Sequence, residues 1–301
     1  MSVLRTCSAV KPPGHSSLVS SQSVSIPLCF NFPITKIILL HNRTTTSTTP
    51  NLISTRFPTH LVKMAESSPP VMSPFGSSSV DPAYCEIIVV RHGETAWNVD
   101  GRIQGHLDVL LNEVGREQAV AVADRLAKEF KISVVYSSDL KRALETAQAI
   151  AKACGGLEVI EDQDLRERHL GDLQGLVYRE AAKICPDAHK ALASHKPDLE
   201  IPGGGESLDQ LYKRCTTVLQ RIGRKHKGQR VVVVSHGGVI RALYKRACPD
   251  NKSGGKVLNT SVSIFQLSDA KRWILKTWGD VSHLGQTGVL ETGFGGDRTS
   301  G

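Results

Sequence analysis

The stretch Cys85-Glu-Ile-Ile-Val-Val-Arg-His-Gly-Glu-Thr95 decides the fold of this chain. Its first part, Glu86 to Val90, is a mostly apolar run rich in β-branched side chains, which predicts a strand buried on both faces of a sheet. The run ends at Arg91, His92 and Gly93. Ligands of open α/β sheets bind beyond the carboxyl ends of parallel strands, so these three residues are candidates for a binding site.

A second stretch, Arg230-Val-Val-Val-Val-Ser-His-Gly-Gly238, has the same pattern of an apolar run followed by His-Gly. It predicts another buried strand, with His236 at its carboxyl end. We therefore expect His92 and His236 to lie side by side at one edge of the same sheet.

Strand-like and helix-like segments alternate through the rest of this part of the chain. We predict helices over 113–130 (capped by Asn112), 140–154, 177–184 (ended by Pro186), about 207–225 and 239–248, and strands over 132–136, 157–160, 261–267 and 273–278. The last two strands are expected to form a hairpin. The alternation predicts a single α/β domain, a three-layer α/β/α sandwich around a mostly parallel central sheet.

The two ends of the chain differ from its middle. Residues 1–65 are rich in Ser and Thr and contain no acidic residue, which is typical of an organellar transit peptide. The alternatives are an extension without an address and a shorter cytoplasmic protein that starts at Met64. We expect a disordered N-terminal extension at 1–83, which includes a Pro- and Ser-rich linker, then the domain at 84–285 and a disordered tail at 286–301. A transit peptide would direct the protein to the chloroplast or another plastid.

Charge and composition exclude several classes of protein. The net charge of +8 is mostly a property of residues 1–80, because residues 81–301 contain 31 basic and 28 acidic residues. A basic face for nucleic acid is therefore not expected. The most apolar segment near the N-terminus, Ile26 to Leu40, is too short and too interrupted to span a bilayer. Seven cysteines without a Cys-x-x-Cys pair are interpreted as free thiols in a reducing compartment.

The polar residues at the predicted strand ends have the chemistry of a phosphoryl site that needs no metal. Arg91 and Arg142 can each bind phosphate oxygens in a bidentate manner. Gly93 and Gly237 have no Cβ, so a phosphate can approach their backbone N–H groups closely. The arginines beside His92 are expected to lower the pKa of its imidazole and leave it neutral, able to attack phosphorus.

Two further residues complete a possible reaction. His236 can donate a hydrogen bond to the charge on the equatorial oxygens, and Glu167 can protonate the leaving alkoxide and then take a proton from water. A metal site made by His92, His236 and Glu167 is an alternative, but no His-x₃-His, Asp-x-Asp or Cys-x-x-Cys spacing supports it. The other histidines of this region are interpreted as exposed or structural: His106, His169, His189, His195 and His226.

This order of motifs resembles the histidine phosphatase superfamily, in the branch that contains the cofactor-dependent phosphoglycerate mutases. The resemblance covers about Glu86 to Leu284. It implies that His92 becomes phosphohistidine, that Glu167 is the proton donor, and that His236 forms the phosphate pocket with Arg91 and Arg142. The substrate-binding residues that it implies are Gly93, Glu94, Thr95, Asn98, Gln104, Gly105, Arg168 and Gly237.

Hydrolysis is favoured over mutase chemistry by the segment between the proton donor and the second histidine. Glu167 and His236 are only 69 residues apart, whereas the mutases of the family have a longer segment that helps to close the pocket. The run Ile201-Pro-Gly-Gly-Gly-Glu-Ser207 resembles the hydrolase members. An open pocket lets water reach the phosphohistidine. Val281 to Gly285 also resembles hydrolases, phosphoserine phosphatases among them, some of which have a C-terminal histidine, here His283, near the substrate.

The sequence thus predicts a phosphatase that acts on a small phosphorylated metabolite and water, in carbohydrate or amino-acid metabolism, with no cofactor and no nucleic-acid or membrane partner. One alternative is a phosphoglycerate mutase that requires 2,3-bisphosphoglycerate, which the mutase-like run Glu167 to Gly175 supports. Another is a non-catalytic phosphate-binding protein. The sequence does not indicate which phosphomonoester is bound or which oligomer forms.

Overall fold

The structure, a computed structural model, describes residues 79–194, 196–251, 254–270 and 272–285. The predicted transit peptide, most of the predicted linker and the predicted tail lie outside these residues. The boundaries of the three predicted segments therefore stay a prediction.

The described residues contain one six-stranded sheet and seven α-helices. The strands are β1 (Tyr84–Arg91), β2 (Val134–Ser137), β3 (Val159–Glu161), β4 (Arg230–Ser235), β5 (Val262–Ser268) and β6 (Trp273–Asp280). The helices are α1 (Ala96–Val99), α2 (Glu113–Glu129), α3 (Lys141–Ala153), α4 (Tyr178–Ile184), α5 (Pro186–Leu192), α6 (Leu208–Lys225) and α7 (Gly237–Ala247). Three short 3₁₀ turns are η1 (Gln163–Leu165), η2 (Gly171–Leu173) and η3 (Ser282–Leu284).

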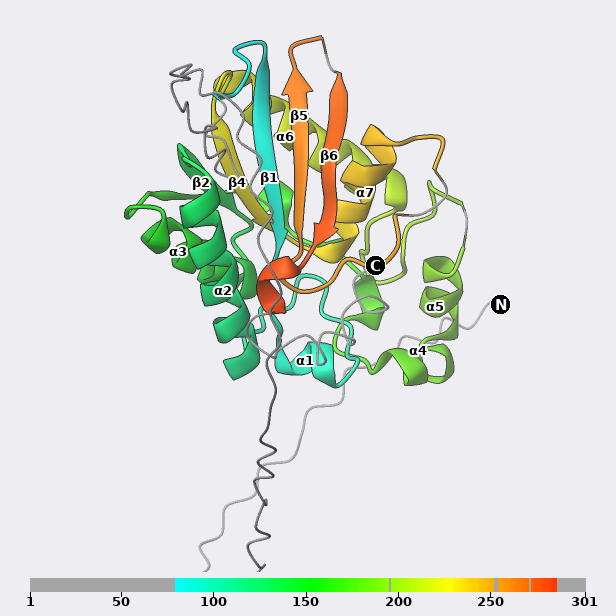
Figure 1. Cartoon of the computed structure of the whole chain (residues 1–301). Helices are drawn as coiled ribbons and strands as arrows, with labels where there is room; N and C mark the ends of the chain where they lie inside the picture. The colour runs from blue at the N-terminus through cyan, green and yellow to red at the C-terminus, as the bar shows by residue number, and fades with distance from the viewer. Residues whose placement is uncertain (1–78, 195, 252–253, 271, 286–301) are drawn as a thin grey trace, which may run out of the picture. The chain divides into compact units, whose positions relative to one another are not determined.

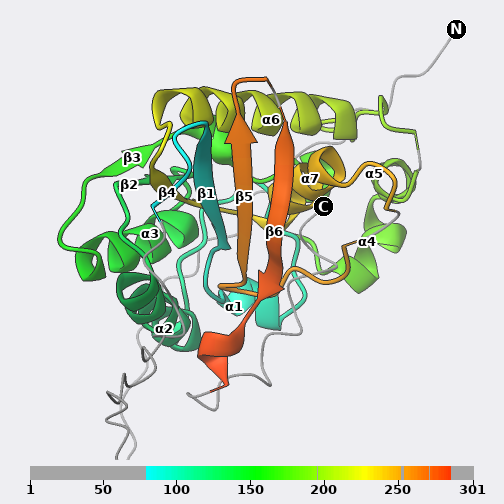
Figure 2. The same cartoon turned by 45° about the horizontal axis from the view of Figure 1, so that its top comes forward.

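The strand order across the sheet is β3-β2-β4-β1-β5-β6 (Figure 1). Strands β3, β2, β4 and β1 run parallel, and the hairpin β5–β6 adds two antiparallel strands beside β1. Helices α2 and α3 cover one face of the sheet, and α6 and α7 cover the other (Figure 2). The predicted three-layer sandwich with a mostly parallel sheet is confirmed.

Strand β1 lies at the centre of this arrangement, between β4 and β5. Its residues Ile87 and Val89 pack into the core under α6 and α7, and Ile88 and Val90 pack into the core under α2 and α3. All four side chains are fully buried. A strand covered on both faces needs apolar side chains at consecutive positions, which explains the continuous apolar run that predicted it.

Two short helices were not predicted. Helix α1 follows shortly after His92, and Thr95 and Asn98 form a capping box at its start. Helix α4 ends before Pro186, as predicted, but Pro186 also begins α5, because proline is well tolerated at the first helical position, where its missing N–H would have no partner. Helices α4 and α5 and the turn η2 build a smaller apolar cluster around Ile103 and Leu173, apart from the sheet.

The five cysteines of the described residues are free thiols, and Cys85 and Cys215 are buried. This agrees with the predicted absence of disulfides in this part of the chain. In the same residues, no helix is long and apolar enough to cross a membrane.

Candidate active site

The two predicted histidines meet at the carboxyl ends of β1 and β4, at the edge of the sheet near α1 (Figure 1). The parallel register pairs Arg91 with Ser235, so the next residue of each strand, His92 and His236, reaches the same place. Their ring centroids are 5.2 Å apart, and the side chains are 2% and 0% exposed. Two hydrophobic strands in register thus place two imidazoles side by side.

The hydrogen bonds of His92 define which nitrogen can react. Its Nδ1 lies 2.7 Å from the carbonyl oxygen of Gly93. A carbonyl only accepts hydrogen bonds, so Nδ1 carries the proton and Nε2 keeps its lone pair in the neutral ring. Burial, followed by the charges of Arg142 and Arg91, holds the pKa of His92 well below its usual value. The predicted direction is therefore right, but burial is the main cause rather than the arginines.

His236 differs from His92 because neither of its ring nitrogens has a hydrogen-bond partner among the described residues. Burial, then the charges of Arg142 and His92, also hold its pKa well below the usual value. Buried polar atoms normally have partners, so two unpaired nitrogens in one ring indicate a place for a ligand. The ring can donate from either nitrogen to an oxygen of that ligand.

Both predicted arginines are buried beside these rings. Arg142, near the start of α3, donates from Nη1 to Leu107 O at 2.9 Å and from Nη2 to Gly105 O at 2.8 Å, while its Nε has no partner among the described residues. Burial lowers the pKa of Arg142 to about 10. Arg91 donates from Nη1 to Val257 O at 2.6 Å. Two buried guanidinium groups next to two neutral imidazoles favour the binding of an anion.

Glu167 approaches the histidines from the loop after η1. Its Oε2 accepts a hydrogen bond of 3.0 Å from the N–H of Gly238, two residues after His236, and its Oε1 accepts one of 2.8 Å from the N–H of Arg168. Glu167 as a whole is 2% exposed. His106 Nε2, 2.6 Å away, donates to the carbonyl oxygen of Glu167. His106, interpreted above as exposed or structural, therefore lies against the predicted proton donor.

Sequence reasoning missed the residue that holds this loop in place, Arg214 of α6. Its Nη1 donates to Asp164 O and to Arg166 O, both at 2.8 Å, and its Nη2 donates to Glu167 O at 3.1 Å. The same guanidinium forms a salt bridge of 2.7 Å with Glu206. No local pattern distinguishes Arg214 from the other basic residues of an amphipathic helix, although the Gly-Gly-Glu-Ser run points to its partner Glu206.

At Gly93 and Gly105, the structure shows a packing reason for glycine that the sequence analysis did not identify. The N–H of Gly93 donates to Thr146 Oγ1 at 3.1 Å, and a Cβ on Gly93 would lie 2.4 Å from the carbonyl oxygen of Gly115. The missing side chain lets α2 pack closely against the segment that follows β1, and the expectation that a phosphate binds this N–H stays a prediction. At Gly105, φ is +51° and a Cβ would lie 2.1 Å from the side-chain oxygen of Gln174.

The remaining predicted residues surround these groups. Asn98 accepts hydrogen bonds through Oδ1 from Thr95 and from Asn259 Nδ2, and Asn259 Nδ2 also donates to His92 O at 3.0 Å. Glu94 accepts a hydrogen bond from Asn112 Nδ2 at the start of α2.

Gln104 is buried, and its Oε1 has no partner among the described residues. Arg168 is buried and donates from Nε to Glu206 O at 2.9 Å. Gly237 begins α7.

The arrangement brings together two imidazoles of lowered pKa, two buried guanidinium groups and a buried carboxyl group near the carboxyl ends of β1 and β4. These are the parts needed to bind a phosphate and to move its phosphoryl group. In the part of the chain that the structure describes, no group of three His, Cys, Asp or Glu side chains is placed to hold a metal ion.

Comparisons with known proteins agree with this chemistry. The family model "Histidine phosphatase superfamily (branch 1)" matches residues 87–281. The chain is 66% identical over 229 residues to phosphoglycerate mutase-like protein 4 of Arabidopsis thaliana (76% of this chain, 99% of that protein). It is 56% identical over 218 residues to a metal-independent phosphoserine phosphatase of the same plant (72% and 91%). A solved mycobacterial glucosyl-3-phosphoglycerate phosphatase in complex with VO3 superposes with a TM-score of 0.56 at 35% identity, covering 65% of this chain and 99% of that one.

Proposed function

The chain belongs to the histidine phosphatase superfamily (branch 1), and we propose that it hydrolyses a small phosphomonoester through a phosphohistidine formed on His92. The observation that carries the assignment of residues is the pair His92 and His236, with ring centroids 5.2 Å apart, buried beside Arg91 and Arg142. The similarity to a metal-independent phosphatase supports chemistry without a metal.

In the first step, Nε2 of His92 attacks phosphorus while the bond to the ester oxygen breaks. The proton on Nδ1 stays in its hydrogen bond to Gly93 O. This bond keeps the ring in the tautomer in which the attacking Nε2 has a free lone pair. Glu167 gives its proton to the leaving alkoxide, and the product alcohol leaves. Arg91, Arg142 and an N–H of His236 compensate the charge on the equatorial oxygens.

In the second step, water attacks the phosphohistidine. Glu167 takes a proton from this water, the P–N bond breaks, and its electron pair returns to Nε2 of His92. Phosphate is released and Glu167 is protonated again, so both groups end as they began. The backbone N–H groups of Arg168 and Gly238 hold the carboxyl group in one orientation for both transfers.

The substrate class that we propose is a phosphomonoester with a carboxylate close to the phosphate. Phosphoserine and glucosyl-3-phosphoglycerate, named in two of the similar proteins, both have this feature. Arg168 is the side chain that we assign to the carboxylate. It is buried next to Glu167, and its one hydrogen bond within the described residues uses Nε, which leaves the two terminal nitrogens for a bidentate ligand.

The decisive experiment measures phosphate release from phosphoserine, 3-phosphoglycerate and a wider panel of phosphomonoesters, with a chelator present. We expect turnover of at least one carboxylated substrate, and a phosphoenzyme that acid destroys and base preserves. The His92→Ala variant should show neither. Loss of activity in chelator, or an unchanged phosphoenzyme in His92→Ala, would refute the proposal.

A mutase is the second candidate, because the chain is 66% identical to a protein named phosphoglycerate mutase-like. The two reactions differ in where the phosphoryl group goes. With phosphate-labelled 3-phosphoglycerate, a hydrolase releases the label as inorganic phosphate. A mutase keeps it on glycerate and depends on added 2,3-bisphosphoglycerate.

We also propose that residues 1–65 direct the protein to a plastid and that the catalytic domain spans 84–285. The composition of 1–65 supports the first point, and the family match to residues 87–281 supports the second. Expression of residues 1–83 fused to a fluorescent protein tests this. Fluorescence that stays in the cytoplasm would instead favour the start at Met64.

A further inference from the structure

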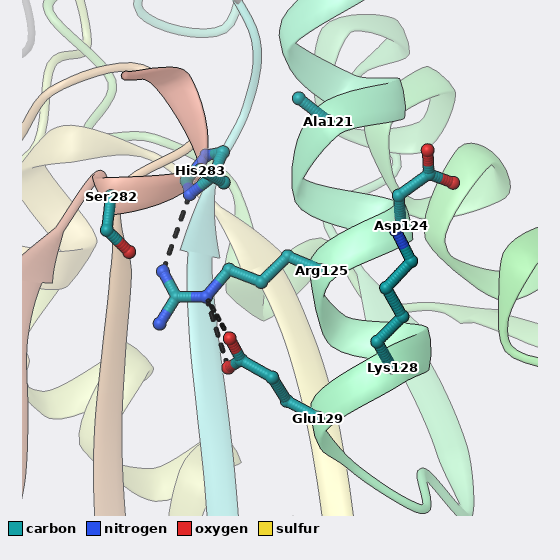
Figure 3. Close-up of a pocket in the computed structure, with 7 residues that line it drawn as sticks. All are labelled: Ala121, Asp124, Arg125, Lys128, Glu129, Ser282 and His283. Carbon is teal, nitrogen blue, oxygen red and sulfur yellow. Dashed lines mark hydrogen bonds and ion pairs between the residues drawn. The ribbon is translucent and has the colours of Figure 1, made fainter. Parts of the chain in front are cut away.

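The C-terminal turn η3 packs against α2 through His283, whose side chain is 8% exposed (Figure 3). The resemblance to hydrolases placed this histidine near the substrate. In the structure it lines a pocket formed by residues of α2 and η3: Ala121, Asp124, Arg125, Lys128, Glu129, Ser282 and His283. The polar contacts of its ring lead to Arg125 on one side and to Thr260 on the other.

These two contacts select one form of the His283 ring. Thr260 donates its hydroxyl proton to Asn259 O at 2.8 Å, so its Oγ1 must accept the 3.1 Å hydrogen bond from His283 Nε2. Arg125 Nη1, 3.4 Å from Nδ1, can only donate. Both neighbours therefore require a neutral ring with its proton on Nε2. The ring thus accepts a hydrogen bond from the guanidinium at Nδ1 and donates one from Nε2 to the threonine.

Thr260 is the residue in need of such support. Its φ is +53°, the one positive φ of a non-glycine residue among the described residues. This left-handed conformation is unfavourable for a β-branched side chain and persists only where the surroundings enforce it. In that conformation its N–H points to the carbonyl oxygens of Arg91, at 3.1 Å, and of His92, at 3.4 Å.

The same short segment binds the main chain of the nucleophile from a second side. Asn259 Nδ2 donates to His92 O, and the N–H of Arg91 donates to Ser261 O at 3.2 Å. Residues 259–261 therefore hold the end of β1 where the strand pairing with β4 stops. Arg125 is itself fixed by Glu129 and by Asp280, which places His283 against a rigid support.

We propose that His283 is a positioning residue for His92, and that it acts by holding Thr260 in its left-handed conformation. This rests on the proposed role of His92 as the nucleophile. Without the imidazole, Thr260 relaxes toward a negative φ, its N–H leaves the carbonyl oxygens of Arg91 and His92, and the reacting nitrogen is no longer held in line with phosphorus. Misplacement of this kind lowers the rate of the chemical step and affects the affinity for the substrate much less.

The test compares His283→Ala in two backgrounds. In the parent we expect kcat to fall on the order of tenfold, with KM changed less than about twofold. His283→Gln should recover most of the activity, because its amide nitrogen can donate to Thr260. In the Thr260→Gly background, where the left-handed conformation carries no Cβ penalty, His283→Ala should cost less than about twofold. Ser282→Ala, in the same turn and the same pocket, is the matched control and should behave as the parent.

An increase in KM at unchanged kcat would overturn the proposal in favour of a substrate contact. An equal loss of kcat in both backgrounds would show that His283 does not act through Thr260. No loss of kcat in the parent background would show that His283 does not position His92. The NMR signal of the buried Nδ1 proton of His92 gives a readout that does not depend on turnover. It should shift in His283→Ala and return in the double variant with Thr260→Gly. A parent without phosphatase activity but with these shifts would refute the proposed function and leave the positioning role supported.

Discussion

The two sides of the candidate site are built in different ways. His92 and His236 extend two central strands, and main-chain hydrogen bonds and two apolar cores fix their positions. Glu167 lies in irregular chain after η1, where the side chain of Arg214 holds three carbonyl oxygens of residues 164–167. The proposed nucleophile is thus attached to the folding core, whereas the proposed proton donor depends on one side-chain network. Substitutions on the second side should therefore lose activity with little loss of stability.

The largest effect is expected for the nucleophile itself. His92→Gln should lower phosphate release by about 10⁴-fold or more, because no other side chain can form the covalent intermediate. Its thermal midpoint should not fall, since the imidazole is buried for chemistry rather than for packing. Phosphate release and a thermal melt check both points. The control is His226→Gln, outside the site at the end of α6. Activity of His92→Gln within tenfold of that of the parent would contradict the assignment of His92 as the nucleophile.

The proton-donor side is tested by Arg214→Lys, which keeps the charge beside Glu206 but loses the planar fork that binds the carbonyl oxygens. We expect kcat to fall roughly 10- to 100-fold, as for a displaced general acid, with a nearly unchanged thermal midpoint. Arg221→Lys is the matched control on the same helix. Its side chain is 59% exposed and pairs with Asp162 at the surface. Equal effects of the two substitutions would remove the difference between the two sides of the site.

Substitutions in the packing around the nucleophile side, unlike His92→Gln itself, should instead lower activity and stability together. A Cβ on Gly115, at the start of α2, would lie 2.0 Å from the carbonyl oxygen of Glu94, next to the catalytic segment. Gly115→Ala should lower the free energy of unfolding by about 1–3 kcal/mol, because backbone must move to make room. Urea unfolding measures this loss. Gly223→Ala in α6, whose Cβ would lie 3.3 Å from the side chain of Leu267, is the control and should cost less.

The same difference explains what the sequence could predict. Strand β1 and its continuation into His92 are visible in the sequence because a doubly covered strand needs an uninterrupted apolar run. The parallel partner β4 carries the same signal, so the meeting of His92 and His236 follows from two local patterns. The cap of α2 by Asn112 was predictable for a similar reason, since a cap is a local structure.

The contacts of Arg214, Asn259 and Thr260 were not predictable, because each joins segments that are distant in the sequence. Arg214 binds carbonyl oxygens 47 to 50 residues away, and Asn259 binds His92 at a separation of 167 residues. No periodicity or motif marks such pairs. Gly93 is a complementary case: its residue type was informative, but the neighbour that requires a glycine there, α2, was identified only in the structure.

The smallest expected effect concerns the pH dependence of stability. In the folded protein, the pKa values of His92 and His236 lie well below the usual value, mainly because of burial. In the unfolded chain they return to about 6.5. As the pH falls through 6.5, the unfolded state therefore binds protons that the folded state does not, and the free energy of unfolding decreases. Both imidazoles thus make the protein less stable in acid.

The double variant His92→Gln/His236→Gln isolates this contribution, because glutamine does not titrate. From pH 7 to pH 6, its free energy of unfolding should fall by about 1 kcal/mol less than that of the parent. Urea unfolding at the two pH values measures the difference, and His189→Gln/His226→Gln, a pair of half-buried histidines away from the carboxyl ends of the strands, is the control. An identical pH dependence in the double variant and the parent would mean that the two imidazoles accept protons in the folded state. His92, at the end of β1, would then not be the neutral nucleophile that the proposed reaction requires.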